Sequence, residues 1–239
     1  MLNSSSVSNN HQIFIFDVNY INLVVLIISA IMEVIPQPPP TQKRFHMLSI
    51  DIGIKNLGFA VISFDKLGKK ELQELTVEFD IFDISKHLTK KSDIVSSRCE
   101  ALIVFFKELF DKYGEFINII IERQVNRNTM AMELMYAITM TLKILNPSNS
   151  QIIIFDPKDK FLKLGLTYST TNKAHKKQSI RYAHQLMSSI WNEQLEYFEQ
   201  FDKKDDVSDA INQCLVWMLF NGIINMSVDE YVRLISGSN

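Results

Sequence analysis

The stretch that decides the fold is SIDIGIKNLGFAVI, residues 49–62. Its apolar residues form two strand-like runs on either side of a polar turn at Lys55 and Asn56, which is typical of two strands joined by a short connection. Asp51 follows the first apolar run, and Gly53 comes two positions later. A carboxylate beside a glycine at the end of a central strand indicates a site that something approaches closely, although a plain turn aspartate remains the alternative.

Further elements follow on the C-terminal side. Partial alternation over residues 71–84 predicts a third strand, which completes an antiparallel meander, and apolar residues at helical spacing predict a helix over residues 94–113. Short apolar runs at Asn118–Glu122 and Gln151–Phe155 are typical of strands buried on both faces, with a helix between them at Thr129–Ile144. This order predicts an α/β domain in which helices flank a mixed five-stranded sheet.

The first 45 residues have a different character. Residues 13–35 are largely apolar, but the cleanest run, Leu23–Met32, is about half of the ~20 residues that a membrane span needs. No Lys or Arg precedes Lys43, which argues against a signal or transit peptide. We expect an N-terminal extension with a Pro-rich linker over residues 1–45, which is either a packing segment or sequence upstream of a start at Met47, and which is less suited to contacting a membrane. The folded domain is expected over residues 46–239.

Composition excludes some classes of protein. The 239 residues are 46% hydrophobic and carry a net charge of −2, so the chain can build a core and has no overall signal for nucleic acid. The only cysteines are Cys99 and Cys214, and the sequence has no CxxC or HExxH spacing. A disulfide framework and a zinc site are therefore not expected, and a reducing compartment is favoured.

Four carboxylates carry the chemical signal. Glu122 ends the run of isoleucines at residues 119–121, where an unpaired charge needs a partner or a metal unless it emerges into water. Asp206 and Asp209 share one face at the start of an apolar-striped helix, where helix capping is the ordinary alternative. An aspartate at a strand (Asp51), a glutamate at the end of a later strand (Glu122) and two aspartates three residues apart on a late helix follow one another along the chain. This is the order expected of a two-metal phosphodiesterase. Oxygen donors of this kind suit two Mg²⁺ ions, or Mn²⁺ in their place.

A family resemblance rests on three segments: SIDIGIKNLGFAVI, IIIERQ at Ile119–Gln124, and DDVSDA at Asp205–Ala210. Together they resemble the RuvC-like Holliday junction resolvases, in the branch of the poxvirus, large DNA virus and fungal mitochondrial enzymes. The resemblance covers about Met47–Asn221. It implies an RNase H-like nuclease domain, a homodimer, and Mg²⁺-dependent cleavage of four-way DNA junctions in the cytoplasm or a viral factory, with the mitochondrion as a second choice.

The same resemblance assigns roles to single residues. It implies Asp51, Glu122, Asp206 and Asp209 as metal ligands. The family's catalytic lysine best matches Lys176, with Lys173 and Lys177 as alternatives. Separately from the resemblance, polar and basic side chains near these positions are expected to contact DNA: Lys55, Asn56, Arg123, Asn126, Arg127, Lys173, Lys177 and Arg181. The residues that follow Glu122 are equally typical of an ordinary loop and helix cap.

Local charge and apolarity add two expectations. Seven basic residues stand against the single acid Asp159 between Lys158 and Arg181, which indicates either a DNA-facing segment or a solvated basic loop. The helix at Thr129–Ile144 is apolar almost all round, which suits burial on more than one side, and a two-fold dimer interface is an additional possibility.

Other functions stay open at this stage. The same carboxylates would serve a nuclease that acts on flaps or on RNA-containing hybrids. An actin-like kinase also opens with DxG, but the chain is short for two lobes and lacks a later glycine-rich phosphate loop. A DNA-structure-binding protein without catalysis, in which the carboxylates only cap helices, is the alternative outside enzymes.

Overall fold

The computed structural model describes residues 44–53, 55–87, 94–124, 128–146, 150–167 and 171–237. These residues belong to one compact unit, Gln42–Asn239. Residues 1–43 of the predicted N-terminal extension lie outside the described residues. The predicted start of the folded domain at residue 46 therefore stays a prediction. Among the described helices, none combines the length and the apolar character that crossing a membrane requires.

A single mixed sheet forms the centre of this unit. Its strands are β1 (Phe45–Asp51), β2 (Asn56–Phe64), β3 (Thr76–Asp83), β4 (Phe116–Glu122) and β5 (Gln151–Phe155). The order across the sheet is β3-β2-β1-β4-β5. The first three strands pair antiparallel, whereas β4 pairs in parallel with β1 and β5 pairs in parallel with β4. The predicted meander and five-stranded mixed sheet are therefore confirmed.

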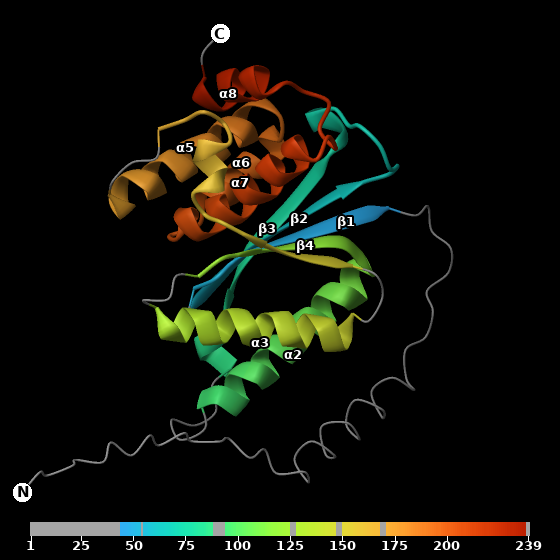
Figure 1. Cartoon of the computed structure of the whole chain (residues 1–239), viewed down its shortest axis with the longest axis vertical. Helices are drawn as coiled ribbons and strands as arrows, with labels where there is room; N and C mark the ends of the chain where they lie inside the picture. The colour runs from blue at the N-terminus through green and yellow to red at the C-terminus, as the bar shows by residue number, and fades with distance from the viewer. Residues whose placement is uncertain are drawn as a thin grey trace, which may run out of the picture. The chain divides into compact units, whose positions relative to one another are not determined.

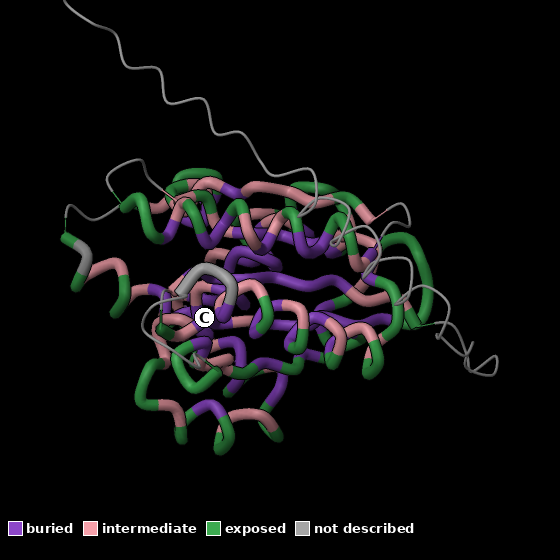
Figure 2. The backbone as a smooth tube through the Cα atoms, turned by 90° about the horizontal axis from the view of Figure 1, so that it is seen from below, coloured by how far each residue is buried: buried purple, intermediate pink, exposed green. Residues whose placement is uncertain are grey.

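Helices cover both faces of the sheet (Figure 1). The helical elements are the 3-10 turns η1 (Leu72–Glu74) and η2 (Ile84–His87) and the helices α2 (Ile94–Tyr113), α3 (Thr129–Leu145), α4 (Asp159–Leu162), α5 (Asn172–Ser189), α6 (Asn192–Glu199), α7 (Lys204–Phe220) and α8 (Val228–Ser236). In Figure 1, α2 and α3 lie below the sheet, and α5 to α8 lie above it. The buried strands run between these layers in Figure 2, where the sheet is mostly purple.

Successive side chains of β1 point to opposite faces of the sheet. Because helices cover both faces, the strand is buried on both sides. Met47 belongs to the apolar cluster beneath α5 and α7, whereas Leu48 and Ile50 belong to the cluster with α2 and α3. This parity places Ser49 and Asp51 on the same face as Met47. The site described below therefore lies on the side of α7.

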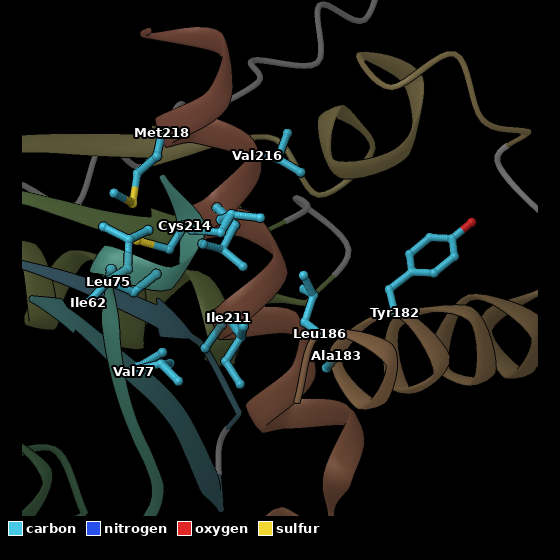
Figure 3. Close-up of a cluster of buried hydrophobic side chains, with 14 of the residues drawn as sticks. Ile62, Leu75, Val77, Tyr182, Ala183, Leu186, Ile211, Cys214, Val216 and Met218 are labelled. Carbon is cyan, nitrogen blue, oxygen red and sulfur yellow. The ribbon is translucent and has the colours of Figure 1, made fainter. Parts of the chain in front are cut away.

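Helix α7 is the main element packed on that face. Its apolar stripe includes Ile211, Cys214 and Met218, which lie between the sheet residues Ile62 and Val77 and helix α5 (Figure 3). Nearly every turn of α7 is buried. The helix is thus held along its length, and the side chains at its N-terminal end are presented to the ends of β1 and β4.

The structure decides two local expectations. The basic segment from Lys158 to Arg181, for which a solvated loop was the alternative to a DNA-facing segment, contains α4 and the first half of α5, and Lys160 within it is buried. Helix α3, for which burial on more than one side was expected, has an exposed side on which Tyr136 and Met140 are 57% and 61% exposed. In both cases the sequence shows which side chains are basic or apolar, but the neighbouring elements of the fold decide which of them are buried.

Candidate active site

Asp51 and Glu122 end the parallel neighbours β1 and β4. The register pairs Ile50 with Ile121, so the two carboxylates come out side by side at the carboxyl edge of the sheet. Asp51 is buried, and Glu122 lies within hydrogen-bonding reach of it. Burial raises the pKa of Asp51 well above its ordinary value, and the charges of Glu122 and Asp209 raise it further. Such a cluster requires a cation or a shared proton.

Helix α7 brings the second pair of carboxylates to the same edge. Its N-terminal end approaches β2 at Gly58, where an added Cβ would lie 2.4 Å from the backbone oxygen of Asp206. Gly58 is the register partner of Asp51. Only a residue without a side chain allows this approach, so Gly58 sets the distance between the helical carboxylates and the strand.

A buried glutamine ties the helix to β1. The Nε2 atom of Gln213 donates to Ser49 Oγ at 2.8 Å and to the backbone oxygen of Ile50 at 2.9 Å. Gln213 follows Asp209 by one helical turn, and its bonds go to the two residues that precede Asp51. These bonds fix the rotation of α7 relative to β1, and with it the direction in which Asp206 and Asp209 point.

Lys160 lies between the acidic groups. Its side chain is 3% exposed, and its Nζ is 2.8 Å from Asp209 Oδ1 and 3.8 Å from Glu122 Oε1. Burial acts to lower the pKa of Lys160, but Asp209, Glu122 and Asp51 together raise it above the ordinary value. Lys160 therefore carries a positive charge that balances the buried carboxylates. It was counted in the basic segment but was not predicted as a site residue.

The predicted catalytic lysine has a different position. Lys176 is exposed on the first half of α5 and forms an ion pair with Asp205. Burial, followed by the charge of Asp205, raises the pKa of Asp206 to about 6. Lys176 thus lies beside the first turn of α7, whereas Lys160 lies among the buried carboxylates.

The residues predicted to contact DNA fall in two places. Lys55 and Asn56 lie where the chain passes from β1 to β2, and Arg123 directly follows Glu122; Lys55 and Arg123 are exposed. The other described residues lie on α5: Lys173, Lys177 and Arg181 are exposed and spaced four apart, so they share one face of the helix. Asn126 and Arg127 lie outside the described residues.

The donor set fits a hard divalent cation. The carboxylates of Asp51, Glu122, Asp206 and Asp209 supply oxygen ligands of the kind that Mg²⁺ and Mn²⁺ prefer. Within the described ranges, no three His, Cys, Asp or Glu side chains are arranged as a ready-made cage for an ion. The ammonium of Lys160 instead bridges Glu122 and Asp209. The donor chemistry still suits a cation, because burial and the neighbouring negative charges raise the pKa of Asp51, and a bound cation would stabilise its ionised form.

Comparison with known proteins gives a family and a fold. Residues 46–221 match the protein family described as Poxvirus A22 protein. Among curated proteins, no sequence match was found. The crystal structure of the yeast mitochondrial Holliday junction resolvase Ydc2 resembles the chain with a TM-score of 0.51 at 18% identity, over 89% of this chain and 87% of that chain. This likeness confirms the RNase H-like fold class.

A second similar structure is that of RuvC from Thermus thermophilus. It gives a TM-score of 0.48 at 12% identity, over 75% of this chain and 98% of that chain.

Proposed function

The chain belongs to the poxvirus A22 protein family, and we propose that it is a Holliday junction resolvase, a nuclease that makes paired nicks in four-way DNA junctions. The observation that carries the proposal is the convergence of Asp51, Glu122 and Asp209 around the buried Lys160 at one edge of the sheet. Acidic groups gathered from two parallel strands and a helix can hold the metal ions of a two-metal phosphodiester hydrolysis.

Asp51, Glu122, Asp206 and Asp209 hold two Mg²⁺ ions in this proposal, and Mn²⁺ substitutes for them. The bound ions supply Lewis acidity to the scissile phosphate and lower the pKa of a water molecule. The protein's contribution is to hold the four carboxylates in place. Gly58 and Gln213 do so by fixing α7 against β1 and β2.

Lys160 is our first candidate for the catalytic lysine, because its ammonium lies among the carboxylates, 2.8 Å from Asp209 and 3.8 Å from Glu122. A preorganised cation in a dry site stabilises the extra negative charge of a phosphorane-like transition state. Lys176 remains the alternative, because it pairs with Asp205, the residue directly before the proposed metal ligand Asp206. Rates at saturating Mg²⁺ separate the two: loss of cleavage in Lys160→Ala with an active Lys176→Ala supports Lys160, and the reverse result supports Lys176.

The basic face of α5 binds the phosphate backbone of the junction arms. Lys173, Lys177 and Arg181 supply this face, and Lys55 and Arg123 contact DNA near the cleaved strand. Backbone neutralisation of this kind makes affinity fall steeply with salt. Removing one of the α5 residues should weaken binding to all junction sequences alike and reduce the salt dependence by about one ion.

A homodimer supplies the two active sites that paired nicks need. The exposed face of α3 is the surface that we assign to it, since Tyr136, Met140 and Ile144 lie at spacings of four residues and are 57%, 61% and 41% exposed. An apolar helical stripe of this kind is self-complementary when two copies meet about a two-fold axis. Sedimentation of the purified protein as a monomer on DNA would exclude this interface.

A panel of labelled substrates tests the proposed activity. The panel contains a synthetic four-way junction, a linear duplex of the same sequence, a flap and an RNA–DNA hybrid, each incubated with Mg²⁺ or with EDTA. We expect nicks in the junction alone, and none in EDTA or with Asp51→Asn. Cleavage of flaps or hybrids instead would retain the nuclease and change its substrate, and junction binding without any cleavage would indicate a structure-binding protein.

A further inference from the structure

A chain of hydrogen bonds leads from the core of the helical layer to Asp209. The amide Nδ2 of Asn212 donates to Ser179 Oγ at 2.8 Å and to the backbone oxygen of Ser179 at 2.9 Å. The hydroxyl of Ser179 in turn donates to Asp209 Oδ1 at 2.7 Å. Ser179 and Asn212 are 1% and 5% exposed. The three residues therefore form a hydrogen-bonded relay between α5 and α7, in which Ser179 and Asn212 are buried.

The direction of this relay follows from the number of protons. A serine hydroxyl has one proton to donate and two lone pairs with which to accept. Because Asn212 donates to Ser179 Oγ, the oxygen is used as an acceptor on that side, and its single proton is directed to Asp209. Asn212 thus selects the hydroxyl rotamer that faces the carboxylate.

Both buried donors engage the same oxygen of Asp209. Lys160 Nζ lies 2.8 Å from Oδ1, which is also the atom that Ser179 contacts. Among the described residues, Oδ2 accepts no hydrogen bond. With Oδ1 held from two sides, the carboxylate plane is fixed and Oδ2 is the oxygen left for a further ligand.

We propose that Ser179, oriented by Asn212, is a positioning residue that fixes the carboxylate of Asp209 so that Oδ2 faces the bound divalent cation. The inference rests on the metal site of the proposed function. Groups that hydrogen bond to a metal-ligating side chain typically change metal affinity by about 10- to 100-fold when they are removed. Ser179→Ala should weaken Mn²⁺ binding to the DNA-free protein by a factor in this range.

The measurement is Mn²⁺ affinity, followed by electron paramagnetic resonance of the free ion, for the whole chain without DNA. Ser208→Ala is the matched control, because Ser208 is also a buried helical serine but donates to the backbone oxygen of Lys204 at 2.6 Å. We expect the control to bind Mn²⁺ as the wild type does. Circular dichroism checks that each variant is folded.

Asn212→Ala provides a second and independent variant. If Asn212 acts through the hydroxyl of Ser179, Asn212→Ala weakens Mn²⁺ binding when it is the only substitution. In a protein that already carries Ser179→Ala, it has no further effect. Should Ser179→Ala fail to fold, the affinity of Asn212→Ala alone decides the matter. Additive effects of the two substitutions, or wild-type affinity in Asn212→Ala, would overturn the relay.

The outcome is separable from that of the proposed function. Wild-type Mn²⁺ affinity in Ser179→Ala, or an equal loss in Ser208→Ala, overturns the inference even if the protein resolves junctions. A protein that binds Mn²⁺ through this relay but cleaves no junction keeps the inference and overturns the proposed function.

Discussion

Replacing Lys160 with methionine should destabilise the metal-free protein strongly. The substitution keeps most of the side-chain volume but removes the charge that lies 2.8 Å from Asp209 and 3.8 Å from Glu122. Lys160 is 3% exposed, so water cannot take over its role. Removing one partner of a buried ion pair costs about 3–5 kcal/mol. In a domain of this size, that corresponds to a fall of roughly 6–20 °C in melting temperature.

Thermal denaturation in EDTA at pH 7.5 measures this effect. Lys163→Met is the matched control, because Lys163 is one turn away and pairs with Asp159 at 3.2 Å while 40% exposed. An exposed pair of this kind is worth less than about 1 kcal/mol. Added Mg²⁺ should restore much of the stability of Lys160→Met, because the ions replace the missing positive charge.

Acidic pH should also reduce the loss, since protonation of the raised-pKa Asp51 removes part of the repulsion. The reasoning is refuted if Lys160→Met and Lys163→Met melt together in EDTA. It is also refuted if the loss in Lys160→Met is the same with and without Mg²⁺.

Three further predictions concern the same site and the proposed interface. Burial raises the pKa of Asp206 to about 6, so the metal-free protein should lose stability as the pH rises from about 4 to about 6 and this carboxyl ionises. Asp206→Asn should therefore melt at a higher temperature than the wild type in EDTA at pH 7, but not at pH 4. Gly58→Ala should cost about 1–3 kcal/mol in urea denaturation and weaken Mn²⁺ binding, because its Cβ meets Asp206. Met140→Glu should give a folded monomer in sedimentation, and an unchanged dimer would exclude the α3 interface.

The sheet was predictable because burial on both faces leaves a clear record in the sequence. The isoleucine run before Glu122 lies in β4, inside the sheet, and is buried as predicted. The run Gln151–Phe155 is a strand as predicted, but it is the edge strand β5 and its isoleucines are only half-buried, so burial on both faces was wrong for it. Helix α2 begins and ends where its apolar spacing indicated, at Ile94 and Tyr113. Patterns of this kind depend mainly on residues that are close to one another in the sequence, so they can be recognised without the fold.

The candidate site was predictable only in its carboxylates. Asp51 and Glu122 stand out because a charge interrupts an apolar run, whereas Lys160 stands among other lysines and reads as solvated. Its burial depends on α7 and β4, where its partners Asp209 and Glu122 lie far from it in the sequence. Ser179 and Gln213 gave no signal either, because a polar residue on a helix becomes informative only when the opposite element is known.

Gly58 is an intermediate case. A glycine inside a strand pattern is itself a sign of close approach, and that sign was present in the quoted stretch. What the sequence did not contain was the identity of the approaching element. The first turn of α7 lies about 150 residues later in the chain and meets Gly58 only in the folded domain.

Cleavage of a cruciform extruded from a supercoiled plasmid tests the central claim most directly. Under single-turnover conditions with Mg²⁺, a dimeric resolvase built on the Asp51 site makes both nicks before it dissociates, so the wild type should convert the plasmid to the linear form. Asp51→Asn should leave it supercoiled. Accumulation of nicked circles by the wild type, or linear product from Asp51→Asn, would contradict the account.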